Sequence, residues 1–536
     1  MQFHRFVLFG FALLIICAGC NQKKVSESEA HLGKADLVIS GNEEAKAHFN
    51  KGLLLLHSFE YFDAREAFIA AQKADPSCSM AYWGEAMTHH WSLWSNQKTE
   101  EARAALKKLG ASPESRQEKA NKPIEKDFLK GADVLFFGSE LKQERDKKYA
   151  EYMAGMHEKY PENQDVAAFY ALSLLGSVSS GRDEKVFGKA AKIAEGILQE
   201  NPEHPGALHY LIHSYDDPDH AKKALDAAYS YAKTAPDAAH ALHMPSHIFV
   251  ALGMWDEVVR SNIDSYGASI TRMQQKELDN DARSYHALHW LLYGYLQKKN
   301  YSEAENIMRD MDKYTHEKPS KRARAYHVAM KGAFLAETGQ WGSDIGKMNV
   351  KTDDLNLMIR AQNSFNQAMV AAHEKDWTEF EKIIDTLSAK IEKAQLMATT
   401  ANISVCSNGG FTSRPANQLD VDRSKVVLYE LQAINAMEKK EIEKVDRLLS
   451  KASELESGTS YMYGPPEIVM PSYELYGQWL LEQNRYEEAL NQFELSLERG
   501  PNRANALQGK LNALANMGRD DEKEELARFY AQMISS

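Results

Sequence analysis

Paired histidines are the residues of this sequence whose type and spacing could do chemistry. Three pairs with helical spacing follow one another along the chain: His209 with His213, His243 with His247, and His286 with His289. Residues three or four apart on a helix share one face, with Cβ atoms about 5–6 Å apart. Neutral imidazoles on one face are good ligands for zinc, copper, iron or nickel, and Asp216 or Asp217 could complete such a site.

Three kinds of chemistry fit these pairs, and the sequence leaves them open. A transition metal, zinc or copper, could bind at His209, His213, His243 and His247. Histidines that become charged near neutral pH could bind an anion or sense acid. A peptide could lie against the rings as flat hydrogen-bonding surfaces. A histidine pair of this spacing also occurs on helices whose polar groove binds nothing.

A repeated pattern indicates the elements that carry the histidines. The same five residue types recur near both ends of the chain: a glycine, then a small residue, a phenylalanine, a second small residue and a proline, at offsets 0, 12, 16, 19 and 24. They are Gly52, Ala64, Phe68, Ala71 and Pro76, then Gly477, Ala489, Phe493, Ser496 and Pro501. The small residues let two helices approach closely, and the proline suits the start of the next helix. The pattern resembles the tetratricopeptide repeat (TPR) family of helical hairpins. The resemblance implies an all-α, TPR-type solenoid, a right-handed superhelix with irregular insertions.

The repeat register brings the histidines into equivalent places. With repeats that start near residues 205, 239 and 285, the second, fifth and ninth places hold His240 and His286, then His209, His243 and His289, then His213, His247 and Tyr293. In TPR proteins these places face a concave groove. The resemblance therefore implies that they line a ligand-binding groove together with Asp216, Asp217, His57, Trp83 and His90. For Trp83 and His90, packing between hairpins is the alternative.

Pro245 conflicts with a regular helix at this place. It stands between His243 and His247, in the stretch HALHMPSHIFVALG. A proline inside a helix removes a backbone hydrogen bond, so we predict a kink here. The stretches around this proline and around His209 are similar to uncharacterised bacterial TPR proteins of the cell envelope, which implies no activity.

The repeats and their interruptions divide the chain. We predict a signal peptide (1–19), a polar tether that begins with Cys20 (20–44), the first TPR hairpins (45–95) and an irregular insertion (96–130). A central TPR array with the histidine-lined groove (131–396) and a loop (397–424) follow. The chain then continues with a helical hairpin (425–456), a second loop (457–472) and the C-terminal TPR hairpins (473–536).

The amino terminus predicts a compartment. Residues 1–20 read MQFHRFVLFGFALLIICAGC, with a basic start, a short apolar run and small residues before Cys20. This ending resembles the signal of bacterial lipoproteins, although Cys17 stands where that family usually has leucine. The resemblance implies lipidation at Cys20, for example with palmitate. We therefore expect the cell envelope as the location, periplasmic or surface-exposed, with membrane contact through the lipid alone.

Composition narrows the function. The net charge of −12 leaves no basic surplus for phosphates, so we expect no nucleic acid as partner. Four cysteines exclude a disulfide framework, and the common hydrolase and phosphate-loop motifs are absent. We therefore favour a protein that is not an enzyme and has no catalytic residues, which binds a peptide, partner protein or small ligand. The alternative is a metal-dependent carrier or hydrolase that uses the histidines.

Overall fold

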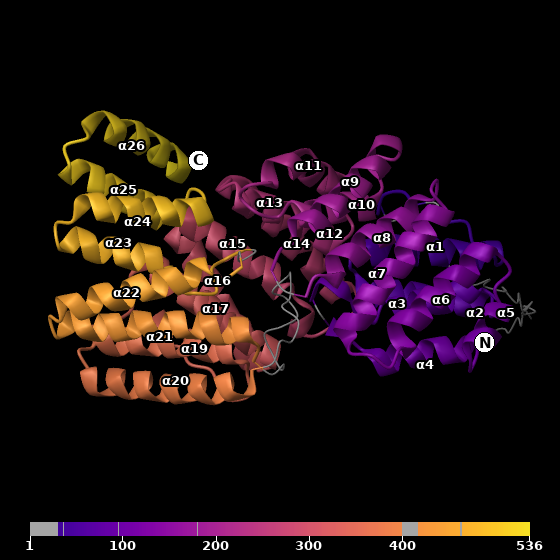
Figure 1. Cartoon of the computed structure of the whole chain (residues 1–536), viewed down its shortest axis with the longest axis horizontal. Helices are drawn as coiled ribbons and strands as arrows, with labels where there is room; N and C mark the ends of the chain where they lie inside the picture. The colour runs from indigo at the N-terminus through magenta and orange to yellow at the C-terminus, as the bar shows by residue number, and fades with distance from the viewer. Residues whose placement is uncertain are drawn as a thin grey trace, which may run out of the picture.

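The chain is an all-α solenoid of helical hairpins, as the sequence predicts. The structure, a computed structural model, describes residues 31–35, 37–94, 96–179, 181–398, 416–460 and 464–535. Helices follow one another in an elongated stack from the N-terminal half to the C-terminal half (Figure 1). Within the described residues the only strands are the two-residue pair β1 (His90–Trp91) and β2 (Asn96–Gln97).

Helices α1 to α14 build the N-terminal half. Their bounds are α1 (Glu43–His57), α2 (Tyr61–Ala74), α3 (Ser79–Met87), α4 (Thr99–Leu109), α5 (Pro113–Glu118), α6 (Pro123–Phe137), α7 (Lys142–Lys159), α8 (Gln164–Ser177), α9 (Glu184–Glu200), α10 (Pro205–Ser214), α11 (Leu225–Thr234), α12 (Ala239–His243), α13 (Pro245–Ala251) and α14 (Trp255–Gln275). Short 3-10 turns lie at Ser92–Trp94, Ala221–Ala224 and Asn280–Ala282.

Helices α15 to α26 build the other half. Their bounds are α15 (Tyr285–Gln297), α16 (Tyr301–Glu317), α17 (Lys321–Thr338), α18 (Asp344–Lys347), α19 (Leu357–His373), α20 (Trp377–Met397), α21 (Gln418–Glu438), α22 (Ile442–Ser457), α23 (Ser472–Glu482), α24 (Tyr486–Arg499), α25 (Ala504–Asn516) and α26 (Asp520–Ser535). Two large cores meet at α15, where Trp290 packs into the first core and Leu288 into the second.

The turns inside the hairpins repeat one backbone geometry. In several of them the second residue after the first helix has a positive φ, and the next N–H donates to a carbonyl five residues back, as in Asn300 to Tyr295 and Arg485 to Leu480. This left-handed cap closes a helix most easily with glycine or asparagine. The chain uses it at Phe59, Gly253, Lys299, Lys375, Lys440, Asn484 and Gly518.

The superhelix brings distant hairpins together. The first hairpin lies against the α10–α14 stretch, where the guanidinium of Arg272 in α14 donates two hydrogen bonds to Asp63 in α2. At the other end, Trp255 Nε1 donates to the carbonyl oxygen of Asn502 at 2.8 Å. Contacts of this kind fix the middle hairpins from both sides and bury side chains that a simple open array would leave on its surface.

One segment that was predicted to be irregular is helical in the structure. Residues 96–130 were expected to be an irregular insertion, but they contain α4, α5 and the first half of α6. Charged residues on α4 hide a buried apolar stripe of Ala102, Ala105, Leu106 and Leu109, and the prolines of α5 and α6 stand in the first turn, where a helix tolerates them. Of the predicted loop 397–424, residues 399–415 lie outside the described residues, and α21 already begins at Gln418.

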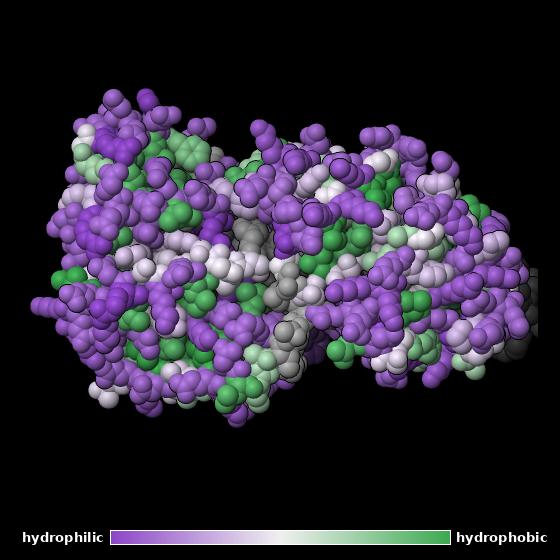
Figure 2. Space-filling model, viewed as in Figure 1, coloured by the Kyte–Doolittle hydropathy of each residue, from purple (hydrophilic) through white to green (hydrophobic). Residues whose placement is uncertain are grey.

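The face of the molecule that Figure 2 shows is largely hydrophilic. The face drawn in Figure 2 carries mostly polar side chains, with hydrophobic ones in separate patches. Among the described residues, no helix is long and apolar enough to span a membrane. The signal peptide, Cys20 and most of the predicted tether lie outside the described residues.

Candidate metal centre

Helix α10 places two of the histidines. His204 caps this helix, its Nδ1 accepting the N–H of Ala207 at 3.2 Å, and Pro205 occupies the first helical position. The four-residue spacing then sets His209 and His213 on one face, with ring centroids 4.9 Å apart. Both side chains are buried, at 0% and 2% exposure. The predicted pairing is therefore present, but it faces the interior and not an open groove.

Pro245 breaks the next helix, as predicted. α12 ends at His243 and α13 begins at Pro245, because the proline has no N–H to continue the ladder of hydrogen bonds. The break supplies His240 and His243 from one short helix and His247 from the other. The rings of His243 and His247 are nearly perpendicular, at 78°, with centroids 5.1 Å apart.

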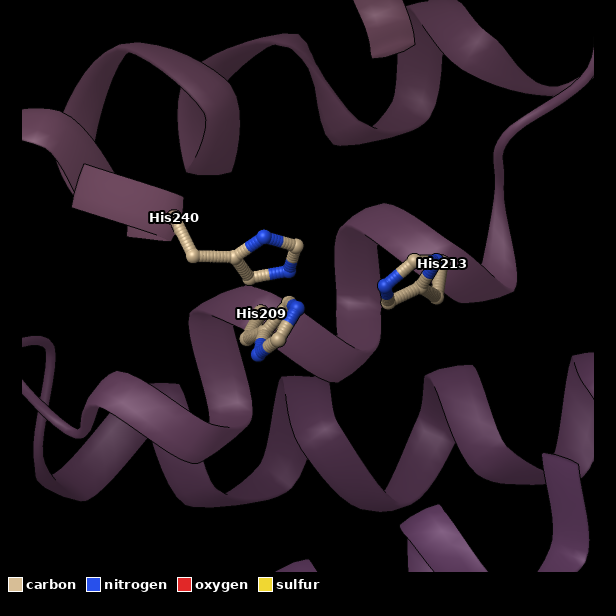
Figure 3. A group of neighbouring side chains, drawn as sticks. All are labelled: His209, His213 and His240. Atoms are coloured by element: carbon tan, nitrogen blue, oxygen red, sulfur yellow. The ribbon is translucent and has the colours of Figure 1, made fainter. Parts of the chain in front are cut away.

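The histidines form two adjacent groups of three. In the first group, His209, His213 and His240 offer nitrogen atoms that all lie within 4.8 Å of one another. Figure 3 shows their rings turned toward a common space, two from the same helix and the third from α12 across it. We call this group site A.

The second group adds a helix farther along the chain. His243, His247 and His286 of α15 also bring their nitrogen atoms within 4.8 Å of one another, and all three are buried. We call this group site B. Sites A and B are contiguous, since the ring centroids of His213 and His247 lie 5.6 Å apart. Trp290 closes one side of site B, 4.9 Å from His243 and 4.6 Å from His247 between centroids.

Hydrogen bonds at Nδ1 fix three of the rings. His209 Nδ1 lies 2.7 Å from the carbonyl oxygen of His57, and His247 Nδ1 lies 2.6 Å from the Oδ2 of Asp216. These partners only accept, so each Nδ1 carries the proton and each Nε2 keeps a lone pair. His243 Nδ1 meets the Oδ1 of Asn262 at 2.7 Å, and the amide of Asn262 is itself oriented by donation to the carbonyl of Val258.

Five Nε2 atoms of the two sites have no such partner. Those of His209, His213, His240, His243 and His286 are buried and form no hydrogen bond. Burial also lowers the pKa of these imidazoles, to about 3 for His243 and well below the usual value for His209, His213, His240 and His286. The rings are therefore neutral at physiological pH, which is the form that binds a metal.

A third cluster nearby, His57, Asp165 and His204, also brings its ligand atoms within 4.8 Å of one another, but here a carboxylate lies between the two histidines. The Nε2 of His57 donates to Asp165 Oδ1 at 2.9 Å, and its Nδ1 accepts from the hydroxyl of Tyr210 at 2.9 Å. His204, whose Nδ1 caps α10, turns its other nitrogen toward the same carboxylate at 3.7 Å. Burial alone would raise the pKa of Asp165, but the two neighbouring histidines, His204 and His57, lower it. We interpret this cluster as a structural link between α1, α8 and α10.

Several predicted groove residues lie away from both sites. His289 faces Tyr326 of α17, with centroids 6.1 Å apart, and burial lowers its pKa to about 4. The hydroxyl of Tyr293 accepts from Arg503 in the C-terminal half. Asp217 pairs with Arg182 at 3.0 Å and with His220 at 2.8 Å.

The groove prediction also needs correction for the early repeats. Trp83 is fully buried between Phe128 and Phe169, so it fills the core. His90 is buried in β1, where its Nδ1 lies 3.1 Å from Gln97 Nε2. His57 belongs to the structural cluster. The physical reason is the same for all three: further helices cover the face that the isolated repeat pattern leaves open.

The sequence reasoning missed Phe59. Its ring centroid lies 4.2 Å from that of His209 and 5.7 Å from that of His240, so it walls site A. Its φ of 57° is unusual for a bulky residue. The signal was present in the repeat alignment, because an aromatic residue stands at the turn position where other hairpins have glycine, lysine or asparagine.

Comparisons with known proteins give no identity. No protein family model matches the sequence, and no curated protein matches it. Solved structures align over most of the chain at low similarity. Human IFIT1, solved as a dimer with PPP-AAAA, is 11% identical with a TM-score of 0.37 and covers 94% of this chain and 96% of its own.

Two further structures are equally distant. Yeast Tom70 is 13% identical with a TM-score of 0.27, and the alignment covers 92% of this chain and 86% of Tom70. The TPR domain of P58(IPK) is 14% identical with a TM-score of 0.22, over 89% of this chain and 99% of that domain.

Proposed function

We propose that the protein binds transition-metal ions, one in site A and one in site B. The observation that carries this proposal is the convergence of three neutral imidazoles within 4.8 Å of one another in each site, with five of the six histidines buried. A metal ion bonded to imidazole nitrogen at about 2.0–2.1 Å needs such ligands to surround one point. Small rotations of the rings would bring each set into that arrangement.

The alternative explanation, that these histidines only pack in the core, does not account for the free-energy cost of their unpaired nitrogen atoms. A buried polar atom without a hydrogen bond costs on the order of 1–3 kcal/mol. Five Nε2 atoms are in this condition in one small volume. A bound ion would give each of them a partner, whereas apolar side chains would fill the same space without the penalty. A histidine that binds metal through one ring nitrogen usually donates a hydrogen bond from the other, and three of the Nδ1 atoms have such acceptors here, for example Asp216 for His247.

Zinc and copper suit these ligands best. Imidazole binds zinc, copper, iron and nickel, and divalent copper binds most tightly in the series. Three neutral nitrogen ligands leave coordination positions open, which is the arrangement of a site that admits a further small molecule. Neither site contains a carboxylate ligand, so the ions that prefer oxygen, calcium and magnesium, fit poorly.

Peptide or partner-protein binding, which the sequence favours, is the second candidate. Burial of the histidines argues against a peptide lying along them, since five of the six are at most 3% exposed. The compartment remains our prediction from the N-terminal sequence: an envelope protein tethered through Cys20. A periplasmic or surface location would give such a protein access to free transition metals.

Elemental analysis of the full chain, purified in detergent and incubated with zinc or copper, tests the proposal. We expect two ions per chain. The variant with His209→Gln and His240→Gln should lose one ion, the variant with His243→Gln and His286→Gln the other, and His209→Ala with His243→Ala both. His289→Gln is the matched control, since this buried histidine of α15 belongs to neither site. Absence of bound ions, or variants that keep both, would reject the proposal.

A further inference from the structure

A cavity of about 450 Å³ opens beside the two proposed sites. Three of the six histidines, His240, His243 and His286, form part of its wall. The remaining wall comes from the first hairpin, the β1–β2 segment, helices α14 and α17 and the 3-10 turn that follows α14. Its volume falls within the range of about 300–1,000 Å³ typical of small-molecule sites. A molecule in this cavity would therefore lie directly against three of the histidines of sites A and B.

Two arginines give the cavity a positive end. Arg283 and Arg322 line it, and neither forms an ion pair with a carboxylate anywhere in the described part of the chain. Arg283 donates to Asn280 Oδ1 at 2.8 Å and to the Tyr266 hydroxyl at 3.1 Å. Arg322 donates to the backbone carbonyl of Asp281 at 2.5 Å. Neutral acceptors and aromatic faces hold both side chains in place without cancelling their charge.

The other charges of the cavity do not remove this positive end. Arg272 also lines the cavity, but Asp63 neutralises it at 2.5 Å. Two carboxyls are present, Glu60 and Asp281. Burial raises the pKa of Glu60, and its Oε1 accepts the N–H of His240. The Oδ1 of Asp281 accepts from the hydroxyl of Ser320 at 2.7 Å. Both carboxyls have structural partners, whereas Arg283 and Arg322 line the cavity without an acidic partner.

Aromatic side chains from the first hairpin and from the segment around β1 also line the cavity. Phe59, Trp91 and Trp94 line it, with Trp94 edge-on to Phe59 at 5.6 Å and to Trp91 at 5.6 Å between centroids. Aromatic surfaces of this kind bind planar apolar groups by stacking and edge contacts. The exposed Phe62 and the half-buried Trp91 and Trp94 leave the cavity open to solvent.

We propose that this cavity binds a small planar organic anion, a molecule with an aromatic or similar flat body and a carboxylate or phosphate head. The head lies between Arg283 and Arg322, since guanidinium forks match both groups in geometry and charge. The flat body lies against Trp91 and Trp94. The bound molecule also lies against His240, His243 and His286, and only its approach to the ions of sites A and B rests on the proposed function.

Calorimetric titration of the full chain tests the inference with three probes of similar shape: phenyl phosphate, benzoate and the neutral benzyl alcohol. We expect at least one of the two anions to bind and the alcohol not to. Arg283→Gln and Arg322→Gln together should raise the Kd at least about tenfold, because each removes charge-assisted hydrogen bonds. Each single change should have a smaller effect in the same direction. Arg309→Gln, at an exposed arginine of α16, is the matched control.

Two measurements separate this inference from the metal proposal. Each titration is repeated on metal-free and metal-loaded protein. Anion binding that depends on the two arginines but occurs in a protein that takes up no metal would support the cavity inference and reject the metal proposal. Metal uptake without anion binding would reject the inference and leave the metal proposal standing. Equal binding of benzyl alcohol, or an unchanged Kd in the folded double variant, would also overturn the inference.

Discussion

The ring of Phe59 packs edge-on against the ring of His209, with 4.2 Å between the centroids and an angle of 61° between the planes. Phe59 reaches this position from the left-handed cap of the first hairpin. A bulky residue pays a conformational penalty there of order 1–3 kcal/mol. The same turn elsewhere uses glycine, lysine or asparagine, so the strained phenylalanine marks the place where the hairpin contacts site A.

Replacement of Phe59 by glycine relieves the backbone strain of the turn but removes the packing of the buried ring. We expect Phe59→Gly to destabilise the protein by about 2–4 kcal/mol, since the buried ring is lost although the backbone is relaxed. Lys440→Gly, at the same turn position of another hairpin, should change the free energy of unfolding by less than about 1 kcal/mol in either direction. Urea denaturation of both variants measures this. Equal stability of the two would show that the ring of Phe59 contributes no packing.

Asp216 and the neighbouring Asp217 allow a controlled test of the hydrogen bond that supports site B. Asp216 accepts from His247 in site B, while Asp217 pairs with Arg182 and His220. Loss of an outer hydrogen-bond partner typically weakens metal binding by about 10–100-fold. We therefore expect Asp216→Asn to raise the Kd of site B about tenfold and Asp217→Asn to leave it unchanged, in competition titrations with a chelator. A similar effect of both changes would point to general destabilisation.

The cluster of His57, Asp165 and His204 is expected to stabilise the fold without binding metal. Asp165→Asn removes the charge that two buried histidines share, and breaking a buried pair of this kind costs about 3–5 kcal/mol. The free energy of unfolding should fall accordingly, while the metal content of the folded variant stays at two ions per chain. A drop to one ion would assign this cluster to the metal centre instead.

Glu430 predicts a pH dependence of stability. Its carboxyl oxygens are buried without hydrogen bonds, and burial, with the nearby charge of Glu456, raises its pKa well above the usual value. Because its pKa is higher in the folded than in the unfolded protein, this carboxyl stabilises the folded state at pH values below its unfolded pKa, near 4.5. The contribution is lost as the pH rises through the folded pKa.

Glu430→Gln should therefore be more stable than the parent protein at pH 7 to 8, by about 1 kcal/mol or more, and its stability should depend less on pH. Glu454→Gln, at an exposed position of α22, should do neither. Thermal unfolding at several pH values compares them. A parent protein that gains stability relative to Glu430→Gln as the pH rises would contradict the sign.

The predicted lipid anchor is testable by fractionation. We expect the full chain to sediment with membranes and Cys20→Ser to remain in the soluble fraction, because a single lipid-bearing residue holds the protein there. Cys17→Ser, three residues earlier, is the control and should not change the distribution. Membrane association of Cys20→Ser would argue against this anchor.

The sequence by itself determined the local features of the protein. Helical hairpins follow from the spacing of small residues, phenylalanines and prolines, and the paired histidines follow from the period of the helix. Pro245 ends a helix wherever it stands, so the break between α12 and α13 could be predicted from one residue. These features depend on bonds and contacts within a few residues, which is why a pattern reveals them.

Only the tertiary structure decided what the histidines face. Each hairpin adds a small rotation, and the sum of many rotations brings Phe59 onto His209 and Asp63 onto Arg272. No local pattern contains that sum. It also decides that His286 joins site B while His289, three residues later on the same helix, turns toward Tyr326. The expected open groove is consequently a buried centre, because the first hairpin covers it.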